Sequence, residues 1–293
     1  MGDHHVHLHP HGAYNGVGPP PGTYPDGFID SFVEHGLANG ADEIGFTEHL
    51  YRCHESADVL GRWWENARKP DLAALTIEHV ELERTLSLDR YVEVVTGAKD
   101  RALPVLLGLE VDFFPETIEA VLELLDRYPF DFLVGSTHWV REWGFDLPTQ
   151  VHEFDRRGAR ESYVDYFEVE TQLAASGAVD VLAHTDVVKK LGVHLAEPPI
   201  DLYEALAVAA GRSGVAIEVS TAGLYQPARE MYPHPDLLSR FFANGVPITI
   251  ASDAHYPEQT GRDRSLAVDF ARSVGYRERV TFTERKRRSI PLE

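Results

Sequence analysis

Short apolar segments rich in β-branched residues recur along the chain, and most of them end in histidine or acidic residues. They alternate with stretches in which apolar residues repeat at helical spacing. Strands that are apolar almost throughout are typical of a parallel sheet covered by helices. The pattern therefore predicts an α/β fold, and seven such repeats favour a barrel. The predicted strands occupy residues 3–9, 43–49, 104–113, 130–140, 179–188, 215–223 and 247–255.

The segments between these strands carry the helix signal. A Pro- and Gly-rich stretch at 16–27 is expected to be a loop, and the basic segment 277–292 is expected to be a solvated strand and turn that completes the fold. No low-complexity linker interrupts the pattern, so residues 1–293 are expected to form one domain. Amphipathic stretches that end near Gly or Asn predict helices within 27–40, 88–102, 162–177 and 201–214.

Composition narrows the class of protein. Of the 293 residues, 43% are hydrophobic and 25% are charged, as in ordinary globular proteins. No apolar run reaches membrane-spanning length and the first residues lack a signal-peptide pattern, so we expect a cytoplasmic protein without membrane contact. The formal net charge of −20 argues against nucleic acid as a partner. Cys53 is the only cysteine, which excludes a cysteine-based zinc cluster, and the oligomeric state stays open.

Histidines and carboxylates gather at the ends of the predicted strands. The segment GDHHVHLHPHG opens the chain, and its alternation places His5 and His7 on one face of an extended strand. Six of the seven strand ends carry His, Asp or Glu, and in a (β/α) barrel these ends meet at one face. Nine or ten donors are too many for one ion, so the pattern predicts two or three divalent metal ions, with Zn²⁺, Fe or Mn²⁺ all compatible.

Seven motifs make this prediction more specific. DHHVHLHPHG, GFTEHL, GLEVDF, GSTHWV followed by GFDLP, LAHTDVVKK, STAGLYQPAREMYP and SDAH occur in this order. They resemble the motifs of the PHP (polymerase and histidinol phosphatase) superfamily, in particular its monofunctional histidinol-phosphatase branch. The resemblance implies a distorted (β/α)7 TIM-like barrel and hydrolysis of a small phosphorylated metabolite, L-histidinol phosphate, in histidine biosynthesis.

The resemblance also implies a set of metal ligands. Glu110 would bridge two ions, and His9 is a rival to His11 because the stretch between HxH and PHG is shortened here. Asp3 resembles an aspartate that orients a metal-bound imidazole, and Glu48 would do likewise or touch a metal. The implied ligands are His5, His7, Glu110 and Asp253 for one ion, Glu110, His138 and His184 for a second, and His49, His255 and His11 for a third.

The charge of a phosphate monoester suggests the mechanism. Divalent cations neutralise the phosphate oxygens and lower the pKa of a bound water. A hydroxide that bridges two ions is then expected to attack phosphorus in line, without a phosphoenzyme. The catalytic residues are expected to be Glu110, Asp253 and His255, with Asp253 or His255 passing a proton to the departing oxygen.

Substrate recognition calls for cationic residues near the phosphate and acidic or amide groups near the amine of histidinol phosphate. Lys189, Arg229 and Arg262 are the candidates for the phosphate. The family usually has an arginine after AGL, and this chain has Tyr225 there, which leaves a different small phosphate ester open as the substrate. Further alternatives are an amidohydrolase-like C–N hydrolase, although its bridging lysine is replaced by Glu110, and a non-catalytic metal-binding barrel.

Overall fold

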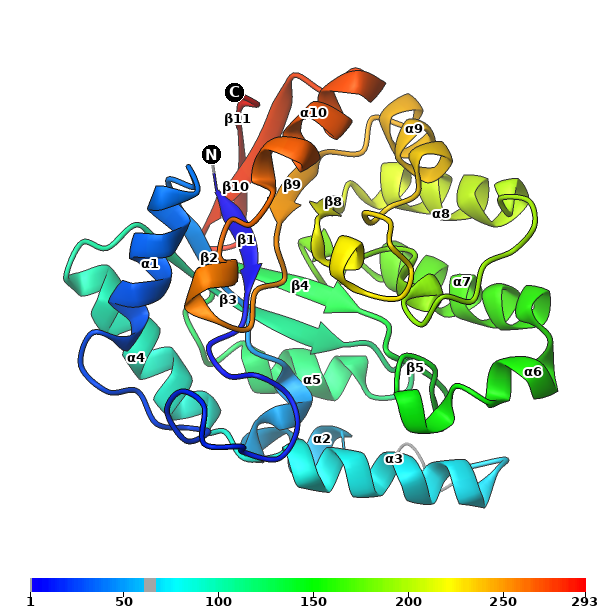
Figure 1. Ribbon diagram of the computed structural model, residues 1–293, viewed down its shortest axis with the longest axis horizontal. Helices are drawn as coiled ribbons and strands as arrows, with labels where there is room; N and C mark the ends of the chain where they lie inside the picture. Colours follow the sequence, from blue (N-terminus) through cyan, green and yellow to red (C-terminus); the bar gives the residue numbers. More distant parts are fainter. Residues whose placement is uncertain (1, 61–66) are drawn as a thin grey trace.

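The computed structural model of the protein describes residues 2–60 and 67–293. Its centre is a parallel sheet in the order β1-β2-β3-β4-β7-β8-β9, so every one of the seven predicted strands is present (Figure 1). The edge strands β1 and β9 approach each other, and the amide of His7 after β1 donates a hydrogen bond of 2.7 Å to the carbonyl of Ala254 after β9. The expected seven-stranded barrel is confirmed as a sheet that nearly closes. The strands are β1 (Asp3–Val6), β2 (Ile44–Phe46), β3 (Val105–Asp112), β4 (Phe132–Ser136), β7 (Val181–Leu182), β8 (Ala216–Ser220) and β9 (Ile248–Ala251).

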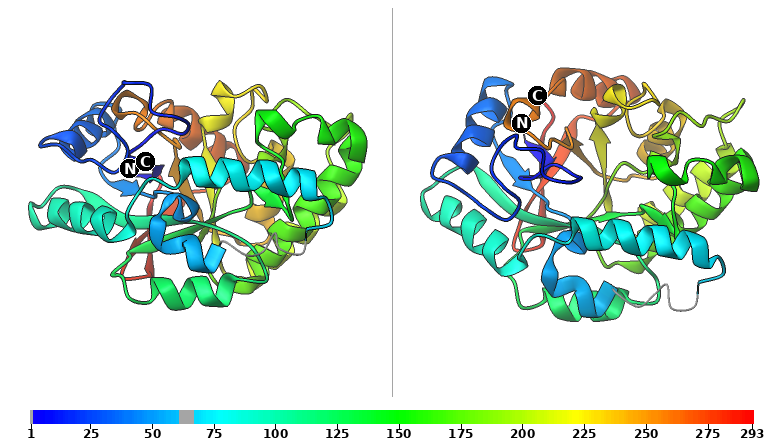
Figure 2. Two further views of the ribbon diagram at one scale, coloured as in Figure 1. Left: turned by 90° about the horizontal axis from the view of Figure 1, so that it is seen from below. Right: turned by 60° about the horizontal axis from the view of Figure 1, so that its bottom comes forward.

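Helices surround this sheet on the outside (Figures 1 and 2). The four stretches with helical periodicity all form helices, and the small hairpin β5 (Trp139–Val140) and β6 (Trp143–Gly144) follows β4. In the described residues, no helix is long and apolar enough to cross a membrane. The helices are α1 (Phe28–Ala38), α2 (Ala57–Leu60), α3 (Pro70–Glu83), α4 (Leu88–Asp100), α5 (Ile118–Leu125), α6 (Glu153–Arg157), α7 (Ala159–Ser176), α8 (Ile200–Ser213), α9 (Pro235–Ala243) and α10 (Arg264–Val274).

Glycines let a large aromatic side chain fill the barrel interior. A Cβ atom at Gly45 or at Gly108 would lie 2.7 Å or 2.6 Å from the ring of Phe132. Because real Cβ atoms do not approach other atoms so closely, these two strand positions require glycine. Phe132 is fully buried there, so the barrel interior near the N-terminal ends of the strands is a packed core.

The C-terminal hairpin closes the end of the barrel away from the histidine-rich strand ends. Strands β10 (Glu278–Thr283) and β11 (Lys286–Pro291) pair antiparallel, as expected for a strand and turn. The expectation that the whole segment is exposed to solvent is wrong for β10, because its four central residues are buried. Phe282 stacks on Phe132 with ring centroids 5.7 Å apart, and Val280 joins the same apolar cluster.

We expect Phe282→Ala to lower the free energy of unfolding by about 3 kcal/mol, because the substitution leaves a cavity against Phe132. Urea unfolding followed by circular dichroism measures the change. Leu266→Ala is the control, since this leucine is 48% exposed, and it should shift stability by no more than about 0.5 kcal/mol. Equal effects of the two substitutions would show that the hairpin does not seal the barrel.

Candidate metal centre

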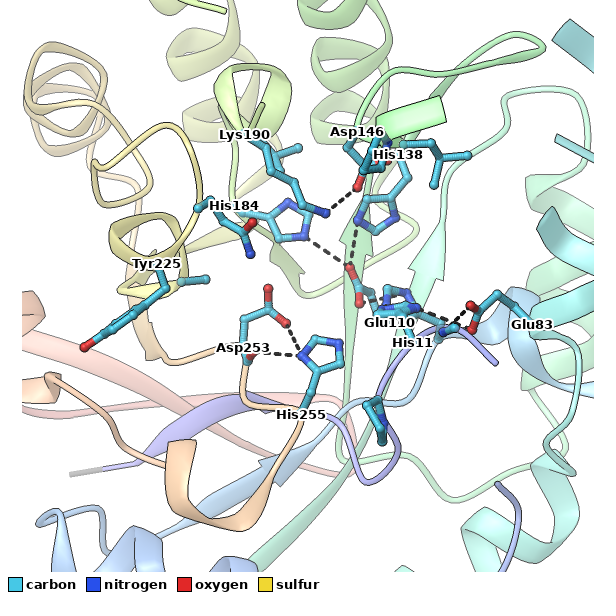
Figure 3. A pocket seen from close by; sticks show the side chains of 18 of the residues that line it. His11, Glu83, Glu110, His138, Asp146, His184, Lys190, Tyr225, Asp253 and His255 are labelled. Atoms are coloured by element: carbon cyan, nitrogen blue, oxygen red, sulfur yellow. Dashed lines mark hydrogen bonds and ion pairs between the residues drawn. The ribbon is translucent and has the colours of Figure 1, made fainter. Parts of the chain in front are cut away.

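A pocket of about 650 Å³ opens where the parallel strands end (Figure 3). Its floor is made of histidines and carboxylates, and its walls come from α3, the β5–β6 hairpin and the loops after β7, β8 and β9. Loops at this end of a β/α barrel are where such folds hold their active sites. The position of the strand ends therefore brings residues that are far apart in sequence into one cavity.

Glu110 on β3 is the centre of the floor. Its side chain is fully buried and lies close to the labelled rings of His138 and His184 in Figure 3. Imidazole nitrogens of five histidines lie within 3.6 Å of its carboxylate. From Oε2 the distances are 3.1 Å to His5 Nε2, 3.3 Å to His7 Nε2 and 3.0 Å to His49 Nδ1. From Oε1 they are 3.3 Å to His184 Nε2 and 3.6 Å to His138 Nε2.

The loop after β9 supplies the other side of the floor. Asp253 Oδ1 lies 3.3 Å from His7 Nε2, and the ring of His255 stacks on that of His7 with centroids 4.4 Å apart. His11 enters from the loop after β1, with its Nε2 3.1 Å from Nε2 of His49. All nine side chains named above as possible metal ligands thus lie at one end of the barrel.

The donor set fits metal ions. Three groups of ligand atoms lie close enough together to hold an ion each: His5, His7 and Glu110; His49, Glu110 and His138; and His7, His49 and His255. Several of these atoms are buried without a hydrogen-bond partner, including Glu110 Oε1, His49 Nδ1 and His255 Nε2. Buried polar atoms without a hydrogen-bond partner lower the stability of the folded protein, and a cation bound between them would remove this cost.

The charges around the floor also favour a cation. Burial would raise the pKa of Glu110, but the imidazoles of His49 and His5 hold it well below its ordinary value. Burial lowers the pKa of His49, and it lowers that of His255 to about 4. Glu110 is therefore ionised and the imidazoles of His49 and His255 are neutral, which are the states in which these groups bind a metal. At His5 burial is outweighed by the charges of Glu218, Glu110 and Asp253, which raise its pKa well above the ordinary value, so a metal there would replace a proton.

Two carboxylates behind the floor orient the candidate ligands. Glu218 Oε2 on β8 lies 2.8 Å from His5 Nδ1, and Asp112 Oδ1 on β3 lies 2.9 Å from His138 Nδ1. Such partners fix the tautomer of a metal-binding histidine. Sequence reasoning missed both residues, although a carboxylate within an otherwise apolar buried strand is a signal that could have found them.

The structure changes the interpretation of three residues near the first strand. His9 packs against the rings of Tyr24 and Phe28 and does not line the pocket, so His11 is the histidine of this loop that reaches the cluster.

Asp3 was expected to orient a metal-bound imidazole, and this expectation is wrong. Its carboxylate accepts hydrogen bonds from the amides of Ser252 and Gly261 and so anchors the segment that carries Asp253.

Glu48 holds the loop after β1. Its Oε1 accepts hydrogen bonds of 2.8 Å and 2.9 Å from the amides of Leu8 and His9, while its Oε2 is 3.9 Å from Nδ1 of His7. The carboxylate therefore supports the histidine strand from behind.

The candidate substrate residues divide into two groups. Arg262 and Tyr225 line the pocket, whereas Lys189 and Arg229 do not. Lys189 is buried and its ammonium pairs with Asp186 at 2.8 Å and Glu230 at 3.0 Å, so a role in holding phosphate is wrong for this lysine.

The neighbouring residue takes the position expected of Lys189. Lys190 reaches the pocket and pairs with Asp146 at 2.8 Å. His79 on α3 also lines the pocket beside Tyr51 and Trp139, although nothing in its helical sequence context distinguishes it from a surface histidine.

The fold and the floor of the pocket are those of a metal-dependent barrel hydrolase. The family model described as "PHP domain" matches residues 24–222. The chain is 33% identical over 255 residues to a probable histidinol-phosphatase of Deinococcus radiodurans, covering 87% of this chain and 90% of the relative. The chain therefore belongs to the PHP domain family.

Solved structures with the same fold include a histidinol phosphate phosphatase of Lactococcus lactis, which was crystallised with zinc, L-histidinol and phosphate. It has a TM-score of 0.68 at 19% identity and covers 98% of both chains. A second structure, of a histidinol phosphatase from Listeria monocytogenes assigned as putative, has a TM-score of 0.69 at 17% identity and covers 91% of this chain and 99% of its own. At these identities the likeness shows the fold.

We expect Glu218→Gln to weaken the binding of divalent metal about 10- to 100-fold, because it removes the negative partner of His5. Competition with a chelating dye measures the affinity. Glu43→Gln is a matched control, since Glu43 lies 2.8 Å from Nε2 of His4, whose ring contacts Phe132 in the barrel core and does not line the pocket. Metal affinities that stay equal in both variants would contradict the orienting role of Glu218.

A second prediction concerns Glu170 of α7, whose Oε2 accepts a 2.7 Å hydrogen bond from Thr137. Burial raises the pKa of Glu170 from 4.5 to about 8. Between these pH values the folded protein keeps a proton that the unfolded chain releases, so this group makes stability fall as pH rises from about 4.5 to about 8.

Glu170→Gln does not titrate, so it should remove that part of the decline. Urea unfolding at pH 5 and pH 8.5 measures it in the wild type and the variant. Glu168→Gln, on the exposed side of the same helix, should decline as the wild type does. A Glu170→Gln variant with the full wild-type decline would show that this carboxyl is ionised in the folded protein at neutral pH.

Proposed function

We propose that this protein is a metal-dependent histidinol-phosphatase, which hydrolyses L-histidinol phosphate to L-histidinol and phosphate. The observation that carries the proposal is the buried carboxylate of Glu110 within 3.6 Å of five imidazoles, at the floor of a pocket large enough for a small metabolite. The names of the relatives from Deinococcus radiodurans and Lactococcus lactis support this substrate.

The floor would hold two or three divalent ions, with zinc supported by the composition of the Lactococcus lactis crystal. Bound there, such ions neutralise phosphate oxygens and lower the pKa of a water molecule. Glu110 is shared between two of the three positions. The proposed ligands are His5, His7, Glu110 and Asp253 for the first ion, Glu110, His138 and His184 for the second, and His11, His49 and His255 for the third.

Asp253 and His255 are proposed to handle the proton of the reaction. His255 Nδ1 lies 3.7 Å from Asp253 Oδ1, and both side chains are partly exposed to the pocket (Figure 3). Apart from His11, the other proposed ligands are almost fully buried, so Asp253 and His255 form the carboxylate and imidazole pair that water and a departing oxygen can reach.

The walls of the pocket suit the remainder of the substrate. Tyr51, His79 and Trp139 form an aromatic side, where the ring centroids of Tyr51 and Trp139 are 5.2 Å apart. An imidazole can stack on such a surface. Glu83 and Asp146 lie nearby, and although Asp146 Oδ2 pairs with Lys190, its Oδ1 has no hydrogen-bond partner among the described residues and can accept one from the amine of histidinol phosphate.

Two wider statements rest on the same proposal. Residues 1–293 would work as one catalytic domain, because the floor draws on residues from His5 to His255. Activity in histidine biosynthesis would place the protein in the cytoplasm. An amidohydrolase-like reaction is less well supported, because the strand position that would need a bridging lysine carries Glu110.

We expect Glu110→Gln to lower kcat for L-histidinol phosphate at least about a thousandfold, because the shared anionic ligand is lost. Phosphate release from metal-replete protein measures the rate, with a panel of other phosphomonoesters run beside it. Glu119→Gln, on the exposed side of α5, is the control and should retain wild-type rates. Full activity of Glu110→Gln would contradict the proposed role of the floor, and preference for another ester would change the substrate.

A further inference from the structure

Two loops that follow neighbouring strands meet at the mouth of the pocket. Tyr225 lies in the loop after β8, and Arg262 lies in the loop between β9 and α10. The Arg262 guanidinium carbon is 3.3 Å from the centroid of the Tyr225 ring. A cation this close to an aromatic face is attracted to it, and the flat stacking limits the orientations of the guanidinium.

Tyr225 also engages the one carboxylate next to Arg262 in the sequence. The Tyr225 hydroxyl donates a hydrogen bond to Oδ2 of Asp263. In the part of the chain that the structure describes, no carboxylate lies within ion-pair distance of the Arg262 guanidinium. Its Nε is buried and has no hydrogen-bond partner among the described residues. Tyr225 therefore holds Arg262 in place and leaves its N–H groups available.

This free cation stands out among the residues that line the pocket. The other lysine or arginine of the described lining is Lys190, which is already paired with Asp146. The chain as a whole has a net charge of −20, so a phosphate dianion meets a mostly negative protein. An unpaired guanidinium at the mouth supplies local positive charge and a planar donor set that matches phosphate oxygens.

Hydrogen bonds connect this arginine to the metal side of the pocket. The side-chain Oε1 of Gln259 accepts a 2.9 Å hydrogen bond from the amide of His255. The carbonyl of the same glutamine accepts a 3.0 Å hydrogen bond from the amide of Arg262. One short loop thus fixes His255 and Arg262 relative to each other, facing the same cavity.

We propose that Arg262 is a specificity-determining residue that binds the phosphate group of the substrate, and that Tyr225 is the positioning residue that keeps the guanidinium available. The inference rests on the proposed phosphatase function and deepens it. It gives Tyr225, which follows the AGL motif, a role in presenting the neighbouring guanidinium to a phosphate ester.

The test uses metal-replete full-length protein and measures two quantities, KM for L-histidinol phosphate and the inhibition constant of inorganic phosphate. Arg262→Ala should raise both about tenfold or more, with a much smaller change in kcat, because charge-assisted hydrogen bonds to phosphate are lost. Arg262→Lys should recover part of the loss. Tyr225→Ala should shift both constants in the same direction by a smaller factor, and Tyr225→Phe should shift them less than Tyr225→Ala because the ring is kept.

Arg212→Ala is the matched control, since Arg212 is an exposed arginine near the end of α8 and its removal changes the net charge equally. It should leave both constants unchanged. Metal content and the midpoint of thermal unfolding, measured for every variant, separate lost binding from lost folding.

Two outcomes overturn the inference. An unchanged inhibition constant for phosphate in Arg262→Ala means that the guanidinium does not touch phosphate. A fall in KM means that Arg262 faces the cationic part of the substrate and repels it. If the wild type hydrolyses no phosphate ester, the proposed function fails, but calorimetric binding of inorganic phosphate to the wild type and to Arg262→Ala still decides the role of Arg262.

Discussion

The burial of the Glu110 carboxylate is the constraint on which the site depends. A carboxylate without solvent is stable only where positive charge or several donors surround it. Here the surroundings are imidazoles whose nitrogens approach one another as well as the carboxylate, as His5 Nε2 and His7 Nε2 do at 3.0 Å. Cations between these atoms remove both problems together, so the protein interior at this end of the barrel is built around the metal ions that it holds.

The barrel topology makes this arrangement possible. Each parallel strand delivers its last residues to the same rim, and the closing contact between β1 and β9 brings His7 next to Asp253. Residues outside the floor then fix the rim: Asp3 anchors the loop after β9, and Glu218 orients His5. At the opposite end of the barrel, Phe132 packs against Phe282 of the C-terminal hairpin, and this packed core gives the strand ends a rigid base.

Much of this could be predicted from the sequence, because the signals are local. Strand ends with His or Glu are visible as motifs, and the seven strands follow from their apolar runs. Residues whose role depends on contacts between distant segments were missed, as with Glu218 behind His5. The choice between Lys189 and Lys190 depends on which way a short helical turn faces, and only the fold shows that Lys190 reaches the pocket.

The same limit applies to the C-terminal hairpin and to the pocket mouth. A basic segment suggests solvent exposure, yet the four central residues of β10 are buried. The contact of Phe282 with Phe132 is not visible in either segment alone. Tyr225 and Arg262 are far apart in the sequence, and their stacking appears only when the two loops are brought together.

The most direct test of the account is a crystal structure of the metal-loaded protein with anomalous diffraction measured above and below the zinc absorption edge. The account predicts two or three anomalous peaks at the floor of the pocket, two of them within bonding distance of the Glu110 carboxylate. A single peak that does not contact Glu110, or no peak at the floor in protein shown to contain zinc, would contradict it.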